Sequence, residues 1–400
     1  MSRILKLFFI TLVCAIGWPA FSNASQLQLS GDARWLVLAA REDRQDAIME
    51  ARESSYFLPR TFVVRAKNGW YAILSGPVQA QTMEQIRKAD YANAVPEDAY
   101  LSKGSNYREL IWSSPEMVRV ELDGNASASA QLENLKVEVV RKDAEGNPSD
   151  GEDFVETFLD ITLHDANGAP LYALKTDTDV YSSFGNSLEM MRILPDTPYP
   201  QVIVRRYTGG AHCCIDTSIL TMDEENNWVT VRAGTFDAGA DYRVFDLDGD
   251  GTLELLTVDQ SFFYLFAPYA GSFAPLEIQR LEGTKLVNVS ADPAYRGEFI
   301  SELNSLEEYA NERADLWNAN GFLAAWAAVK TRLGDFIPAL ARVTESHGPS
   351  DGFGVRVCPD GSNIENCSYE QSVVLPFPAG LTVHLVQQGY LASGAAESPQ

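Results

Sequence analysis

Residues 61–75 hold the feature that most constrains the fold: two β-type runs separated by a tight turn. The runs 61–65 and 70–75 are rich in β-branched and aromatic residues, which favour strands. Lys67-Asn68-Gly69 between them has the composition of a hairpin turn, and Gly76-Pro77 ends the second run. The sequence therefore predicts an antiparallel hairpin, and the neighbouring segments are expected to extend its sheet.

These neighbouring segments complete a small α+β domain over residues 30–104. Strand candidates lie at 35–40 and 99–102, and helical patterns lie at 41–53 and 82–91. The order βαββαβ is that of a ferredoxin-like domain. Two helices would cover one face of this sheet, so we expect the other face to be open.

An open face with aromatic and polar side chains suits sugars, which have apolar CH faces and hydroxyl rims. The candidate ligand-binding residues are Trp35, Arg41, Arg65, Trp70 and Tyr71. Strand alternation places Trp70 and Tyr71 on opposite faces, so at most one of them lies on the open face and the other is core.

The domain resembles the SPOR family, a small bacterial envelope module. The resemblance covers about 75 residues and rests on the opening strand at 35–39, on 62–65, on Asn68-Gly69-Trp70-Tyr71 with the strand that follows, and on Gly76-Pro77. It implies binding to peptidoglycan, with a preference for glycan strands stripped of stem peptides. Two positions depart from the family pattern. Leu38 stands where a Gln is frequent, and Val78 stands where an aromatic residue is common.

The rest of the chain predicts a multidomain α+β protein. Residues 105–134 are expected to be a linker, and 135–290 a mainly antiparallel β domain built from short strands and turns. Residues 297–345 carry helical periodicity and are interrupted at Asn320-Gly321, which predicts a helical hairpin with a kink at Pro338. Residues 346–392 are expected to hold a disulfide loop and short strands.

Residues 246–254 form the sharpest chemical motif. Asp246, Asp248 and Asp250 stand at alternate positions, Gly251 permits a sharp turn, and Glu254 closes the set. A hard cation prefers several oxygen ligands of this kind, so calcium is the expected cofactor, with the Thr252 carbonyl as a further ligand. The β-type flanks make the loop similar to the strand-flanked loops of FG-GAP and VCBS repeats. The alternative is an acidic β-turn that binds only water.

The first 24 residues have the basic, apolar and small-residue order of a cleavable export signal, with cleavage expected after Ala24. The alternative is a short membrane anchor that is retained. No later run is long and apolar enough to predict a transmembrane helix, and a periplasmic location is expected. Four cysteines remain after cleavage. Cys358 and Cys367 are expected to pair, whereas Cys213 and Cys214 either bridge each other or stay as buried thiols.

Charge excludes one class of partner. The chain has 31 basic and 55 acidic residues and a formal net charge of −24, so it repels nucleic-acid phosphates. No nucleic-acid partner is expected.

No catalytic residues are predicted. His212 and Cys213 are adjacent in sequence, but neighbours on a strand point to opposite faces, which disfavours a nucleophile–base pair. The sequence favours an exported peptidoglycan-binding protein. The rival is an envelope scaffold that binds a protein partner and has lost glycan binding, as Leu38 and Val78 suggest. A cryptic wall hydrolase is the lesser alternative.

Overall fold

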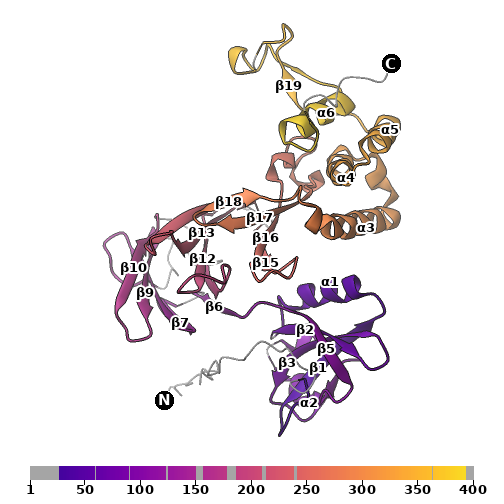
Figure 1. The fold of residues 1–400 in the computed structure, drawn as a ribbon. Helices are drawn as coiled ribbons and strands as arrows, with labels where there is room; N and C mark the ends of the chain where they lie inside the picture. The colour runs from indigo at the N-terminus through magenta and orange to yellow at the C-terminus, as the bar shows by residue number, and fades with distance from the viewer. Residues whose placement is uncertain are drawn as a thin grey trace, which may run out of the picture.

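The computed structural model describes residues 27–58, 60–89, 91–122, 125–149, 156–177, 186–209, 213–237, 241–362 and 364–392. Both the predicted export signal and His212 lie outside the described residues. The described chain is built from antiparallel sheets and a C-terminal group of helices (Figure 1). The predicted α+β class is therefore confirmed. No described helix is both long and apolar enough to cross a bilayer.

The N-terminal domain has the predicted βαββαβ order. Its elements are β1 (Arg34–Arg41), α1 (Arg44–Ser54), β2 (Thr61–Ala66), β3 (Tyr71–Val78), α2 (Met83–Ile86) and β4 (Tyr100–Ser102). The sheet order is β4-β1-β3-β2-β5. Asp43 caps α1 by accepting hydrogen bonds from the backbone N–H groups of Gln45 and Asp46. The apolar stripe predicted for this helix, Ala47, Ile48 and Ala51, is buried against the sheet.

The prediction of a linker at 105–134 is wrong. This segment forms β5 (Tyr107–Ser113), β6 (Met117–Glu121) and β7 (Ser127–Leu132). β5 extends the first sheet beside β2, and β6 and β7 belong to the middle region. Small and polar residues alternate along β7, and only the last residue, Leu132, is buried. Such an edge strand has the composition of a linker, which is why sequence composition misassigned it.

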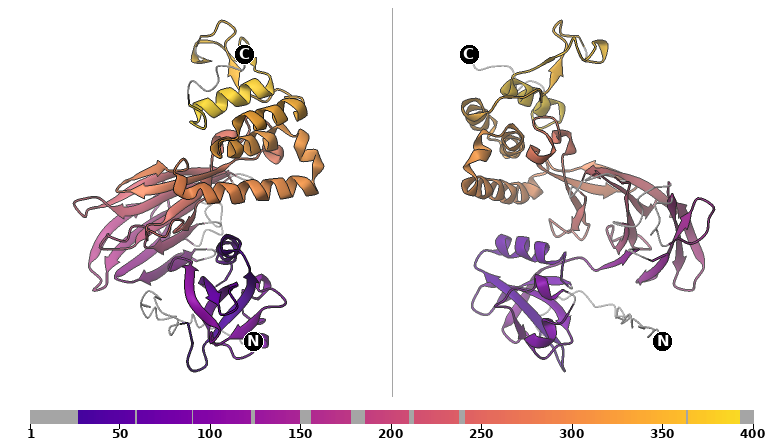
Figure 2. Two further views of the ribbon diagram at one scale, coloured as in Figure 1. Left: turned by 45° about the vertical axis from the view of Figure 1, so that its right-hand side comes forward. Right: turned by 180° about the vertical axis from the view of Figure 1, so that it is seen from behind.

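The middle region stacks three antiparallel sheets (Figures 1 and 2). The first has the order β10-β9-β8-β7, the second β14-β13-β12-β11-β6, and the third β15-β16-β17-β18. The strands not yet given are β8 (Leu135–Asp143), β9 (Thr157–Asp165), β10 (Pro170–Lys175), β11 (Ser187–Met191), β12 (Gln201–Tyr207), β13 (Cys213–Met222), β14 (Trp228–Asp237), β15 (Arg243–Phe245), β16 (Glu254–Val258), β17 (Leu276–Glu282) and β18 (Lys285–Asn288).

Strand alternation gives the middle sheet two buried faces. In β12, Val202 and Val204 pack towards the β7–β10 sheet, and Ile203 packs towards the β15–β18 sheet. In β16, Leu255 packs in the same core as Ile203, whereas Leu256 packs against residues of the helical region. The second and third sheets therefore each supply apolar residues to two neighbouring layers.

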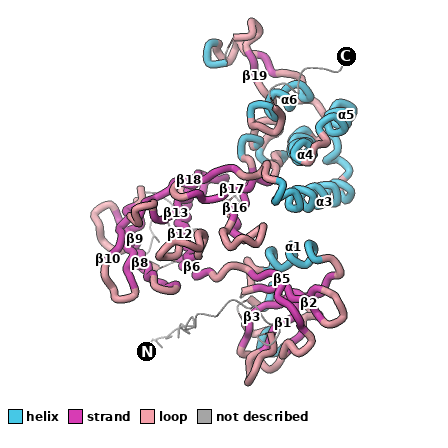
Figure 3. The backbone as a smooth tube through the Cα atoms, in the orientation of Figure 1, coloured by secondary structure: helices cyan, strands magenta, loops and turns pink. Residues whose placement is uncertain are grey.

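The C-terminal region is helical, as Figure 3 shows by colour. It contains α3 (Arg296–Glu312), α4 (Asn320–Arg332), α5 (Phe336–Ser346) and α6 (Phe377–Gln387), and the short strands β19 (Arg356–Val357) and β20 (Val373–Val374). The second predicted helix is in fact two, because the chain turns at Gly334, whose φ is +95°. Pro338 therefore lies in the first turn of α5 and kinks nothing. The helix α6 was not predicted.

Candidate functional site

A cavity of about 500 Å³ opens on the sheet face opposite the helices of the N-terminal domain. Its walls come from β1, β4, the β2–β3 turn and the start of β5. They are Val37, Leu38, Ala39, Ala40, Ala66, Lys67, Asn68, Trp70, Ala72, Asp98, Tyr100, Ser102, Asn106 and Tyr107. The buried lining residues are mostly apolar, and the exposed ones are mainly aromatic, amide or charged and form the rim.

Strand register explains this arrangement. Residues directly opposite each other on paired strands share a face. Tyr100 pairs with Val37, and Tyr107 pairs with Ala66. Both tyrosines therefore lie on the face that carries Val37 and Ala72. Trp70 closes the hairpin, where its carbonyl accepts a hydrogen bond from the Ala66 N–H at 2.8 Å.

Of the five predicted ligand-binding residues, only Trp70 lines this cavity. Its side chain is 42% exposed, and Tyr100 on the adjoining wall is 56% exposed. Two exposed rings on a polar rim form a surface on which a sugar ring can stack.

The prediction for Trp35 is wrong, because its exposure is 0%. Its indole N–H donates to the Leu27 carbonyl at 2.8 Å, and its ring packs edge-on against Phe62. The Leu29 N–H donates to the Lys103 carbonyl at 2.9 Å, which fixes residues 27–29 over this end of the sheet. The face opposite the helices is thus covered at its Trp35 end and open at its Trp70 end.

The predictions for Arg41, Arg65 and Tyr71 are also wrong as cavity residues. Tyr71 packs against the core on the helix side, and both arginines are its strand partners. Arg41 pairs with Glu50 of α1 at 2.7 Å. These three side chains therefore lie on the face that the helices cover.

Tyr100, Asn68 and Asn106 are among the cavity residues that the sequence did not predict. Alternation along the strand predicted at 99–102 was the available signal for Tyr100. Asn68 stood in the predicted turn, where it was assigned only a conformational role. No sequence pattern points to Asn106, because it lies in the segment predicted to be a linker and its position depends on the pairing of β5 with β2.

The acidic loop between β15 and β16 gathers three of its predicted cation ligands. Carboxylate oxygens of Asp246, Asp248 and Glu254 lie within 4.8 Å of one another. Asp246 accepts hydrogen bonds from the N–H groups of Gly249 and Gly251, whose φ angles are +85° and +89°. Positive φ favours glycine at both turns.

Asp250 is not part of this three-carboxylate group; its Oδ1 accepts a hydrogen bond from the Thr252 N–H at 2.7 Å. Burial, the largest cause, raises the pKa values of both Asp246 and Glu254, and neighbouring aspartates add to the effect. A positive charge at this position would counter that repulsion.

Arg280 of β17 already supplies one such charge. Its guanidinium lies 2.8 Å from Glu254, 2.9 Å from Asp248 and 3.4 Å from Asp250. It also donates to the Tyr295 hydroxyl at 2.5 Å. Three acids pair with this single arginine, and Asp246 adds a fourth carboxylate to the loop. The loop therefore retains an excess of negative charge, and its oxygen donors fit a divalent cation alongside Arg280.

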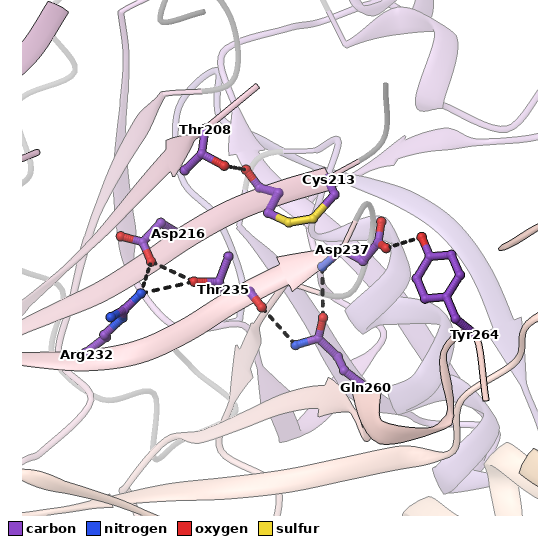
Figure 4. The surroundings of a disulfide bond; sticks show 9 residues. Thr208, Cys213, Asp216, Arg232, Thr235, Asp237, Gln260 and Tyr264 are labelled. Atoms are coloured by element: carbon purple, nitrogen blue, oxygen red, sulfur yellow. Dashed lines mark hydrogen bonds and ion pairs between the residues drawn. A yellow bond between two sulfur atoms is a disulfide. The ribbon is translucent and has the colours of Figure 1, made fainter. Parts of the chain in front are cut away.

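Both cysteine pairs are bridged. Cys358 and Cys367 form the predicted disulfide across a loop. Cys213 and Cys214, for which two states were open, are joined to each other at the start of β13 (Figure 4). Nearby, the Asp237 N–H donates to Gln260, and the Tyr264 hydroxyl donates to Asp237. These bonds tie the end of β14 to the segment that follows β16.

Ser261, His384 and Asp259 meet in the C-terminal core. Ser261 Oγ donates to Asp259 at 2.6 Å and lies 3.1 Å from His384 Nε2. In a catalytic triad the acid holds the histidine, and the histidine accepts the serine proton. Here the acid accepts the serine proton, so the cluster has a different hydrogen-bond order from a triad.

Comparison with known proteins finds a family model that is similar to part of this chain. Residues 299–389 match the sll0997 C-terminal domain. The match covers α3 from Phe299 onward and the rest of the helical region up to the end of α6.

Two relatives were found among curated proteins. The uncharacterized protein y4bJ of Sinorhizobium fredii is 33% identical over 390 residues, which are 95% of this chain and 60% of that protein. The probable thylakoid lumen protein sll0997 of Synechocystis is 33% identical over 197 residues, which are 49% of this chain and 58% of that protein. The chain thus covers about 60% of the length of each relative. No solved structure matches.

Proposed function

We propose that this protein binds the glycan strands of peptidoglycan through the cavity beside Trp70. The observation that carries the proposal is the pairing of two exposed rings, Trp70 and Tyr100, with amide and charged groups on one rim. In this proposal the N-terminal domain is a SPOR-type domain, and its sugar contacts lie at the open end of the sheet. Apolar ring faces would stack on sugar CH groups, while Asn68 and Asn106 would bond hydroxyls.

The proposed location is extracytoplasmic, with the periplasm as the specific compartment. The export-type segment at residues 1–24 and the two disulfides support it. One relative is named a probable thylakoid lumen protein, which is consistent with such a compartment.

The proposal includes a structural calcium ion at the acidic loop. Asp246, Asp248 and Glu254 would hold it. Bound there, the ion would supply positive charge that offsets carboxylate repulsion and ties the turn between β15 and β16. A structural role fits best because these carboxylates point at one another.

A non-enzymatic scaffold is the second candidate function. The observation that favours it is the cover that residues 27–29 place over Trp35. This cover shortens the open face on which glycan binding would depend.

Sedimentation of the full chain with purified sacculi tests the glycan proposal. Trp70→Ala and Tyr100→Ala should each weaken binding about tenfold, the equivalent of about 1.4 kcal/mol, and amidase treatment of the sacculi should increase binding. Phe57→Ala is the matched control, because Phe57 is 70% exposed in the same domain but does not line the cavity. Retention of the wild type no greater than that of an unrelated acidic protein would favour the scaffold.

A further inference from the structure

The Cys213–Cys214 disulfide joins two neighbouring residues at the start of β13. It closes the smallest loop that a disulfide can close, whereas the Cys358–Cys367 bridge joins residues nine positions apart. A disulfide stabilises a fold mainly by restricting the unfolded chain, and the effect is larger for longer loops. The bridge between neighbouring residues therefore adds little stability, so stability alone does not account for it.

The same relation decides how strongly folding protects each bridge from reduction. A bridge that stabilises the folded state is itself stabilised by folding to the same extent, because the two equilibria are linked. Folding therefore protects the Cys358–Cys367 bridge more than it protects the Cys213–Cys214 bridge.

The two bridges also differ in how well a reductant can reach them. Cys213 and Cys214 are both half-buried, so each sulfur-bearing side chain is partly accessible. In the other bridge, Cys358 is only 4% exposed and Cys367 is half-buried. Exchange requires a thiolate to reach a sulfur atom, and accessible bridges are the labile ones. Access therefore favours reduction of the bridge in β13.

The backbone of this bridge is held by two neighbouring segments. The Cys214 carbonyl accepts hydrogen bonds from the Thr208 N–H at 2.9 Å and from the Thr208 hydroxyl at 3.1 Å. Cys213 pairs with Asp237 at the end of β14, and the strand register then passes over Cys214, which makes it the extra residue of a β-bulge. Figure 4 shows Thr208 and Asp237 close to the two sulfur atoms.

Beyond the bulge, β13 is fixed to both of its neighbouring strands by Asp216. Its carboxylate pairs with Arg206 of β12 at 3.1 Å and accepts a hydrogen bond from Thr235 of β14 at 3.0 Å. Neither contact involves the sulfur atoms. A change at the bridge is therefore expected to stay within the bulge and the two segments that hold it.

We propose that Cys213–Cys214 is a reversible redox site that a dithiol reduces, and that its state controls the order of the bulge. One thiolate of the dithiol attacks a cysteine sulfur, which breaks the bridge and forms a mixed disulfide. The second thiolate of the dithiol then attacks the reagent's own sulfur in that mixed disulfide, which releases the second cysteine and leaves the dithiol oxidised. Two electrons and two protons pass from the dithiol to the two cysteines.

Reduction changes the local geometry because the bridge holds both sulfur atoms together. Successive side chains of a strand point to opposite faces, and the two thiols are free to do so once the bond is broken. This movement turns the backbone between them and shifts the Cys214 carbonyl. The Thr208 N–H then loses its acceptor and exchanges its hydrogen with solvent faster.

Titration of the full chain with dithiothreitol tests this proposal, with alkylation and mass spectrometry to count the thiols of each bridge. We expect half-reduction of Cys213–Cys214 at a dithiothreitol concentration at least tenfold lower than that for Cys358–Cys367. In the selectively reduced protein, hydrogen exchange in the peptide that contains Thr208 should be at least fivefold faster. Oxidised dithiothreitol should restore the bridge and the slow exchange.

Two double variants serve as controls. The variant with Cys213→Ser and Cys214→Ser should show fast exchange at Thr208 with or without dithiothreitol. The matched control with Cys358→Ser and Cys367→Ser lacks only the other bridge, and should keep the response of the wild type. Reduction of both wild-type bridges at the same concentration, earlier reduction of Cys358–Cys367, or unchanged exchange at Thr208 after reduction would overturn the proposal.

Discussion

Arg52 of α1 and Glu298 of α3 form a buried ion pair, with Nη1 and Oε2 2.7 Å apart. The guanidinium also lies over the rings of Trp112 and Phe245, at 6.0 and 5.7 Å from their centroids. The pair therefore joins the N-terminal domain to the helical region and to the third sheet. Figure 1 shows α1 facing α3 across this contact.

Breaking this pair should separate the N-terminal domain from the rest of the chain. Arg52→Ala leaves the Glu298 carboxylate buried without its partner, which typically costs about 3–5 kcal/mol. We expect the loss to appear in urea unfolding as an early transition of the N-terminal domain. Glu50→Ala, which removes the exposed pair between Arg41 and Glu50, should cost less than about 1 kcal/mol. Equal effects of the two variants would contradict the coupling role of Arg52.

Calcium should stabilise the protein through the acidic loop. Calcium at about a hundred times its Kd would add about 2.7 kcal/mol, seen as a higher melting temperature. Asp248→Ala should abolish this increase. Asp165→Ala, in an exposed turn outside the carboxylate group, should keep it. An equal increase in melting temperature on adding calcium to Asp248→Ala and to the wild type would contradict calcium binding at this loop.

The variant Arg280→Gln tests whether Arg280 and calcium share the carboxylates of the acidic loop. The change leaves the buried Glu254 without its guanidinium partner, so the calcium-free protein should be less stable than the wild type. It also frees carboxylate oxygens for the ion. The increase in melting temperature on adding calcium should therefore be larger in this variant than in the wild type. An unchanged increase would mean that Arg280 and calcium do not share these carboxylates.

Local features of the sequence predicted much of the fold. The hairpin turn at Asn68-Gly69, the apolar stripe of α1 and the Cys358–Cys367 loop each depend on residues close together in the chain, and the structure contains all three. The alternate spacing of the three aspartates in the acidic loop is likewise a local pattern. These features need no knowledge of distant partners.

The errors arise from contacts between distant segments. Leu27 covers Trp35 only because the chain returns past Gly104. Arg280 reaches the acidic loop from the neighbouring strand β17, where it lies directly opposite Glu254 although the two residues are far apart in sequence. Neither residue has a local pattern that reports its partner. Tyr100 entered the cavity for a similar reason, since the pairing of β4 with β1 decides which face it occupies.

His384 should make stability depend on pH. Burial in the C-terminal core lowers its pKa from 6.5, and Asp259 opposes the shift. Because the unfolded chain binds the proton at a higher pH than the folded one, this contribution is complete above about pH 6.5 and is lost as pH falls towards the folded pKa. Urea unfolding between about pH 5 and pH 7 should show the loss. His384→Gln should reduce the dependence of the free energy of unfolding on pH in this range. An unchanged dependence would mean that other groups cause it.

Gly104→Ala tests whether the cover over Trp35 limits the open face. A Cβ at this position would lie 1.9 Å from the Leu27 carbonyl oxygen and 3.0 Å from the indole nitrogen of Trp35, so residues 27–29 have to move away. The buried indole N–H then loses its acceptor, which costs about 1–3 kcal/mol. The Trp35 indole resonance, assigned with Trp35→Phe, should shift and exchange faster with solvent. Gly69→Ala has a similar positive φ but open space around the new Cβ, so it controls for backbone strain and should leave that resonance unchanged. If Gly104→Ala also increases retention on sacculi, the covered end of the sheet is a masked part of the glycan surface, and unchanged retention would confine glycan contact to the cavity beside Trp70.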